Sequence, residues 1–142
     1  PAPAPRLRGD LELMPALAEL GLADTAKDIS NAGAIGTALM LTECSRVGAV
    51  IDPLAIPRPE GVPLQRWLQT FPSYGFVLSL RPAQVEPVLA RFASRGITAA
   101  AVGRVTAGSA LRLCHGDDEA LLWDTAAEPF ITAPETREAA HA

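Results

Sequence analysis

Residues 28–36, with the sequence DISNAGAIG, combine an acid, a hydroxyl, an amide and two glycines directly before an apolar stretch. The stretch predicts a helix, and the first backbone N–H groups of a helix lack internal partners and carry the positive end of its dipole. Glycine lets an anion approach such groups closely. The segment therefore favours phosphate binding. The alternative is an ordinary helix cap, in which Asp28 or Ser30 accepts a hydrogen bond from the first turn.

Few other positions carry reactive side chains. Lys27 offers a point charge to a phosphate, although a lone lysine is more often simply solvated. His115 precedes three acids at residues 117–119, and we interpret this run as a solvated turn rather than a metal site. Cys44 and Cys114 lie within apolar stretches and predict buried, reduced thiols. The sequence has no recognisable nucleophile–base arrangement and no Walker-type loop, so it assigns no catalytic residue and no metal ligand set.

The spacing of apolar residues predicts the elements that must position these groups. Helices are expected at residues 11–22, 34–44 and 82–94, with a shorter one at 64–71. Strands are expected at residues 47–51, 76–80, 99–105, 111–114 and 121–123. Helices and strands interleave without strict alternation. The pattern predicts an α+β fold, in which a mixed or antiparallel sheet is packed with helices.

Length and composition predict one cytoplasmic domain. The chain has 142 residues, 49% of them hydrophobic and 20% charged, with a net charge of −4. No basic cluster indicates nucleic-acid binding, no apolar stretch is long enough to span a membrane, and no secretory signal is visible. Residues 1–10 begin with alternating prolines and are expected to form an extended linker from a preceding domain. The domain is expected at residues 11–127, and 128–142 as a tail that is disordered or a short helix.

Three stretches, in order, resemble the C-terminal domain of the aminoimidazole ribonucleotide (AIR) synthetase superfamily. They are DISNAG at residues 28–33, YGFVLSL at 74–80 and ITAAAVGRV at 97–105. The first is similar to the superfamily's Asp-x-Ser/Thr-x-Gly-Gly-type loop, and the similarity covers roughly residues 15–115. The match is best with its AIR synthase-related branch. The resemblance implies an α+β domain of this type, with a partly ferredoxin-like arrangement.

The resemblance also implies roles for particular residues. The loop would lie beside a cleft between two domains, where Ser30, Asn31, Ala32 and Gly33 would offer backbone N–H donors and a hydroxyl to a phosphate. Asp28 would orient the loop, or hold a cation or a substrate hydroxyl. Asn31 and Ala32 depart from the superfamily's pattern, and their side chains narrow the approach to a phosphate.

Members of the superfamily activate a carbonyl or amide oxygen by ATP-dependent phosphoryl transfer. The resemblance implies that ATP and Mg²⁺ are held largely by an N-terminal domain that these residues do not include. We therefore expect the 142-residue chain to be inactive alone and to bind no cofactor tightly. Apolar surface left by the missing domain predicts self-association, at least in part as a dimer. The alternative is a non-catalytic binding or assembly module that has kept the fold.

Overall fold

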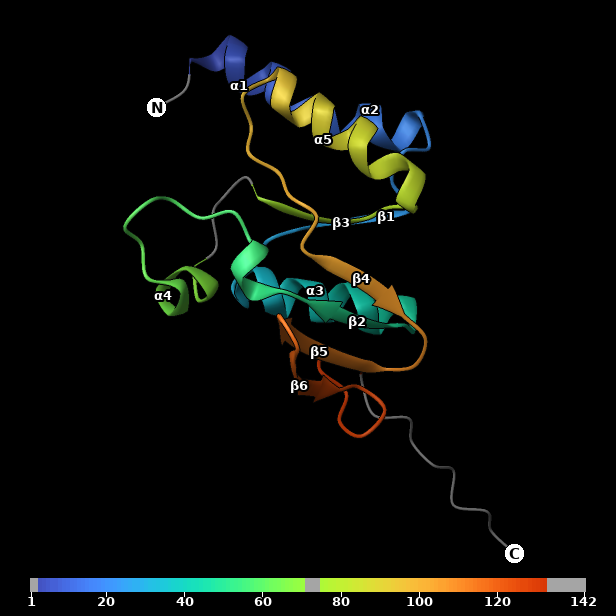
Figure 1. Ribbon diagram of the computed structural model, residues 1–142. Helices are drawn as coiled ribbons and strands as arrows, with labels where there is room; N and C mark the ends of the chain where they lie inside the picture. Colours follow the sequence, from blue (N-terminus) through green and yellow to red (C-terminus); the bar gives the residue numbers. More distant parts are fainter. Residues whose placement is uncertain (1–2, 71–74, 133–142) are drawn as a thin grey trace, which may run out of the picture.

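The computed structural model describes residues 3–70 and 75–132 of the chain (Figure 1). The first half contains α1 (Ala4–Leu11), α2 (Leu13–Glu19), β1 (Thr25–Asp28), α3 (Gly33–Ser45), β2 (Gly48–Ile51), the 3₁₀ helix η1 (Pro53–Ala55) and α4 (Leu64–Leu68). The second half contains β3 (Phe76–Ser79), the 3₁₀ helix η2 (Pro82–Gln84), α5 (Val85–Ser94), β4 (Gly103–Thr106), β5 (Ala110–His115) and β6 (Asp118–Asp124). No helix in these ranges is long and apolar enough to cross a membrane.

The strands form two sheets. Strands β1 and β3 make an antiparallel ribbon in which Thr25 lies opposite Ser79 and Asp28 opposite Phe76. The second sheet has the order β4-β2-β5-β6, with β2 antiparallel to β4 and parallel to β5. Helices α1, α2 and α5 lie beyond the ribbon, and α3 contacts both the ribbon and the four-stranded sheet (Figure 1). The predicted α+β architecture with a mixed sheet is confirmed.

Two apolar cores lie on opposite faces of the ribbon. Successive side chains of a strand point to opposite faces, so Val77 packs against one core and Leu78 against the other. The core shared by α3 and the four-stranded sheet is built on Ala38, Leu39, Ala49, Ile51 and Leu111. The core shared by α2 and α5 is built on Leu13, Leu17, Val88 and Phe92.

Several predicted elements are found close to their expected bounds. The long helix α3 ends at Ser45 and is followed by Arg46, which adopts the left-handed conformation with φ of 54°. The predicted helix at residues 82–94 begins as a 3₁₀ turn and continues as α5, and Gly96 follows it with φ of +65°. Glycine adopts this conformation without steric cost, which is why it is common just after a helix.

The N-terminal segment differs from the expected extended linker, because residues from Ala4 onward form helix α1. Proline is compatible with this start, since Pro5 lies in the first turn, where its missing N–H would have no helical partner. The segment is tied to the domain by Asp10, whose carboxylate accepts a hydrogen bond from Arg95 Nε at 2.8 Å. This contact with Arg95, the residue that follows α5, favours a helix over an extended chain.

Two strands also differ from expectation. The strand expected at residues 99–105 begins only at Gly103, which lies opposite Ile51, the last residue of β2. One further hydrogen bond joins the Asp52 N–H to the Val102 carbonyl at 2.8 Å, and the chain then turns into η1, which ends the pairing. Strand β1 was not predicted, and it includes Asp28, which was expected in a loop. The short helix expected at residues 64–71 ends at Leu68. Tyr74, from the second resembling stretch, and residues 133–142 lie outside the described residues.

Candidate functional site

The predicted phosphate loop connects the end of β1 to the start of α3. Asp28 belongs to β1, and the N–H of Ile29 donates to the carbonyl of Gly75 at 2.8 Å, which extends the pairing with the β3 side by one residue. Ala32 is the residue that precedes α3, and it provides no side-chain cap. No hydrogen bond within the described part of the chain makes Asp28 or Ser30 a cap of α3, so the ordinary-cap alternative is not supported.

Two of the loop N–H groups that were predicted to bind phosphate are used inside the domain. The N–H of Ser30 donates to the hydroxyl oxygen of Thr37, a fully buried residue, at 3.1 Å. The N–H of Gly33 donates to the carbonyl of Ser30 at 2.8 Å. Asn31 and Ala32 are exposed at the tip of the loop, beside the positive end of α3. The tip, rather than the whole loop, is therefore the part that can meet an anion.

Gly33 has a structural role that the sequence did not indicate. Its φ is +68°, and a Cβ atom built there would lie 2.1 Å from the carbonyl oxygen of Leu68, the last residue of α4. A glycine is required here by both the backbone conformation and the close approach of α4. This side of Gly33 is occupied by a carbonyl oxygen, which would repel a phosphate rather than bind it.

Lys27 and Asp28 lie next to each other on β1 and form an ion pair. Lys27 Nζ is 3.5 Å from Asp28 Oδ1, and the side chains are 33% and 70% exposed, respectively. An exposed pair of this kind contributes about 0–1 kcal/mol to stability. The predicted cation for a phosphate therefore has a carboxylate partner, and Asp28 presents its second oxygen to solvent.

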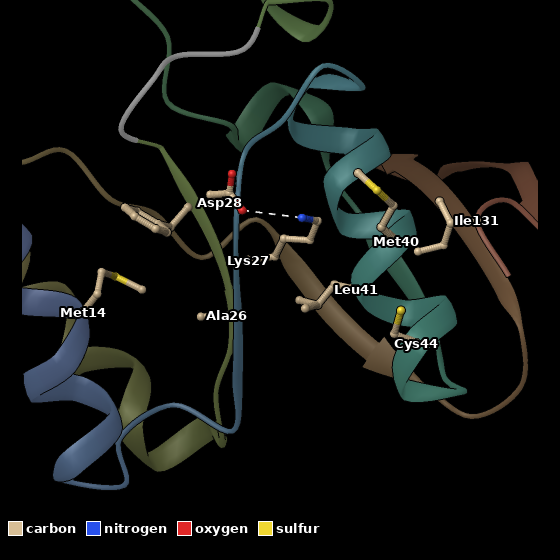
Figure 2. A pocket seen from close by; sticks show the side chains of 9 residues that line it. Met14, Ala26, Lys27, Asp28, Met40, Leu41, Cys44 and Ile131 are labelled. Atoms are coloured by element: carbon tan, nitrogen blue, oxygen red, sulfur yellow. Dashed lines mark hydrogen bonds and ion pairs between the residues drawn. The ribbon is translucent and has the colours of Figure 1, made fainter.

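Both residues border an open pocket of about 510 Å³ between β1 and α3 (Figure 2). In Figure 2 the side chain of Leu41 projects from α3 toward β1, and those of Met40 and Cys44 lie on the front of the helix, between Leu41 and Ile131. Cys44 is exposed, so the prediction of a buried thiol is wrong for this residue. The prediction relied on the apolar neighbours of Cys44 in the sequence, but residues 3–70 and 75–132 leave one apolar face of α3 uncovered. Cys114 is partly buried, and both thiols are free.

Glu43 is a buried acid of α3 whose contacts the sequence did not reveal. Its carboxylate accepts hydrogen bonds from the N–H groups of Phe130, Ile131 and Thr132 at 3.0, 2.9 and 3.2 Å. It also accepts one from the hydroxyl of Thr132 at 2.7 Å. Burial raises the pKa of Glu43, but these hydrogen bonds outweigh burial and lower the pKa below its ordinary value of 4.5. The only signal in the sequence was a lone acid within an apolar helix.

His115 lies at the carboxyl end of β5, and Asp52 follows the parallel strand β2. His115 Nδ1 is 3.6 Å from Asp52 Oδ2, and the Leu54 N–H donates to the other carboxylate oxygen at 2.8 Å. His115 is 66% exposed and lies beside a turn, in keeping with the predicted solvated turn. Within residues 3–70 and 75–132, no three His, Cys, Asp or Glu side chains converge to hold a metal ion.

Comparison with protein families gives a match to the AIR synthase related protein, C-terminal domain, over residues 4–115. An uncharacterized protein of Synechocystis sp. is 45% identical over 119 residues, which are 84% of this chain and 37% of that protein. An uncharacterized protein of Methanocaldococcus jannaschii is 36% identical over 118 residues, which are 83% of this chain and 36% of that protein. The chain thus spans little more than a third of the length of these relatives.

Solved structures with a similar fold include PurL of Thermotoga maritima. The structure complexed with AMPPCP superposes with a TM-score of 0.70 and 17% identity, over 78% of this chain and 20% of PurL. The structure complexed with ADP gives a TM-score of 0.68 and 17% identity, over 81% of this chain and 20% of PurL. At this level of identity the likeness establishes a shared fold and no more.

Proposed function

We propose a function from one premise: the chain belongs to the family of the AIR synthase related protein, C-terminal domain. In this proposal it is the C-terminal domain of an ATP-using enzyme that activates a carbonyl or amide oxygen by phosphoryl transfer. The loop at residues 28–33 faces a phosphate and forms one wall of the cleft. The rest of the catalytic machinery belongs to the further domain of the longer protein, so the isolated chain does not turn over.

The observation that carries the proposal is the exposed loop tip at the start of a long helix. Asn31 and Ala32 are exposed, and α3 behind them has 13 residues, enough for a full dipole effect at its first turn. The fold is shared with PurL structures solved in complex with ADP, with ATP and with FGAR. These complexes support a search for a nucleotide first.

In this proposal the residues of the loop have different roles. Asn31 and Ala32 contribute backbone N–H groups, and the hydroxyl of Ser30 adds a donor. The exposed carboxylate of Asp28 suits a Mg²⁺ ion that is bound by one or two carboxylates together with phosphate oxygens and water. When bound, Mg²⁺ would neutralise phosphate charge. Further ligands would come from the remainder of the protein.

A second candidate function is a non-catalytic binding or assembly module. The internal hydrogen bonds of the Ser30 and Gly33 N–H groups favour this function, since these two donors are then not available to a phosphate. The Leu68 carbonyl against Gly33 favours it for the same reason. A module of this kind would keep the fold and bind no nucleotide.

Calorimetric titration of Mg-ATP into the full-length protein separates the two functions. Asn31→Asp places a negative charge at the loop tip, which should weaken Mg-ATP binding about tenfold, or ~1.4 kcal/mol. The same charge is tolerated or favourable beside a helix N-terminus, so stability should not fall. Gln84→Glu is the matched control, because it adds the same charge at the start of α5. Absence of Mg-ATP binding by the full-length protein would exclude the enzymatic proposal and leave the module.

A further inference from the structure

Helix α3 is apolar around nearly its whole circumference, but its described neighbours cover only part of it. Ala38 and Leu39 are buried, at 5% and 3% exposure, in the core shared with the four-stranded sheet. Met40 and Leu41 are only partly buried, and Cys44 is exposed. A helix that is apolar on all sides is typical of one that is enclosed on all sides. Within the part of the chain that the structure describes, one face of α3 therefore lacks the cover that its sequence predicts.

This uncovered face forms one wall of the pocket between α3 and β1, which we call the α3 groove (Figure 2). Ala26 of β1 and Met14 of α2 belong to the opposite side of the groove, which holds about 510 Å³. Apart from Lys27 and Asp28, the side chains larger than alanine that line it are apolar or sulfur-containing: Met14, Met40, Leu41, Cys44, Phe76 and Ile131. Methionine adapts its shape to a partner, and such side chains are enriched at binding surfaces.

The charges at the groove do not call for a charged partner. Lys27 and Asp28 are the charged residues that line it, and they pair with each other at 3.5 Å. The occupant that fits is an apolar, uncharged protein surface, since interface centres are depleted in charge.

We propose that the α3 groove is the docking surface for the further domain of the full-length protein. The chain spans 37% and 36% of its two relatives, so proteins of that length contain a large remainder that can occupy the groove. Asp28 belongs both to the groove and to the predicted phosphate loop. A domain seated in the groove would therefore face the loop tip and close the cleft. The inference rests on the proposed function for the identity of the partner domain.

The exposed thiol of Cys44 reports directly on whether the groove is occupied. In the 142-residue chain Cys114→Ser leaves Cys44 as the sole thiol, and in the full-length protein every cysteine outside these residues is replaced by serine as well. The reaction of Cys44 with 5,5′-dithiobis-2-nitrobenzoate is followed by release of the coloured thiolate. We expect Cys44 to react at least about tenfold more slowly in the full-length protein than in the 142-residue chain, because access governs thiol reactivity. The matched control has Cys44→Ser, Cys114→Ser and Ser94→Cys in the same two backgrounds, so that residue 94 carries the sole thiol. Ser94 ends α5 on the other side of the β1–β3 ribbon. This control should react equally fast in both proteins.

Two outcomes would overturn the proposal. Equal reactivity of Cys44 in both proteins would show an open groove in the full-length protein. Protection that appears in the 142-residue chain as its concentration rises would identify a second copy as the occupant.

A substitution in the α3 groove gives a second, independent test of the docking proposal. Cys44→Asp should be tolerated by the isolated chain, since the position is exposed, but should lower the Tm of the full-length protein by burying a charge. An unchanged Tm in the full-length protein would contradict the docking. Neither measurement uses ATP. If calorimetry shows no nucleotide binding, the thiol and Tm measurements therefore still test the docking proposal.

Discussion

The carboxylate of Glu43 and the N–H of Ile131 meet at 2.9 Å across 88 residues of sequence. Phe130 and Thr132 donate to the same carboxylate, so three consecutive backbone groups converge on one side chain. The contact fixes the segment after β6 against α3. It also places Ile131 beside the α3 groove, so a buried acid helps to shape one edge of the proposed docking surface.

Glu43→Gln should destabilise the isolated chain by about 1–3 kcal/mol, because buried hydrogen-bonding groups lose their partners. Glutamine keeps one acceptor oxygen but places an amide NH₂ group against backbone N–H groups that also donate. Urea unfolding measures the change, with Glu19→Gln at the exposed end of α2 as the control. Equal stability of the two variants would mean that Phe130–Thr132 contributes little to the folded state.

The stability of the chain should fall in acid partly through Glu43. Its pKa is lowered in the folded state, so its contribution is fully present above its ordinary value of 4.5 and is lost as the pH falls through the lower folded value. Hydrogen bonds from Arg95 and Ser109 lower the pKa of Asp10 and Asp124 in the same direction. Urea unfolding between pH 7 and pH 3 should show a shallower acid loss for Glu43→Gln than for the wild type. Parallel pH curves would assign the acid loss to other groups.

Gly33→Ala should destabilise the domain by more than the same change at Gly61. Both glycines have positive φ, at +68° and +76°, so both substitutions carry the left-handed penalty of about 1–2 kcal/mol. Only Gly33 also has the Leu68 carbonyl in the way, whereas nothing lies within 4 Å of a Cβ at Gly61. Thermal unfolding compares the two variants. If Gly61→Ala is as damaging as Gly33→Ala, the close approach of α4 adds no constraint.

Thr37→Val should loosen the start of the phosphate loop. The substitution removes the hydroxyl that accepts from the Ser30 N–H and leaves that donor without its partner, at a cost of about 1–3 kcal/mol. Thr42→Val is the control, because the Thr42 hydroxyl donates to the Leu39 carbonyl of the same helix. Hydrogen exchange should show faster exchange of the Ser30 amide in Thr37→Val only. An unchanged Ser30 rate would argue that the loop does not depend on this contact.

Much of the local structure could be predicted from the sequence because its causes are local. The apolar run after Gly33 was enough to predict α3, and the spacing of Val88 and Phe92 with Gly96 behind them predicted the helix that contains α5. The family could also be recognised, since three short stretches carry its pattern in order. These features depend on neighbours within a few turns of the chain, and the residue types there express them directly.

The candidate site depends on contacts between segments that are distant in the sequence. Only the tertiary structure shows which of these segments meet. Pairing of β1 with β3 moved Asp28 from a loop into a strand, and the Leu68 carbonyl gave Gly33 a packing role. The Thr37 hydroxyl accepts a hydrogen bond from the Ser30 N–H, so the candidate anion site is limited to the loop tip at Asn31 and Ala32. These contact partners depend on how the helices and the two sheets pack against each other. The sequence by itself determined the long helix α3, the helix that contains α5, the mixed α+β class and the family. The tertiary structure decided which donors, acids and apolar faces remain available for binding.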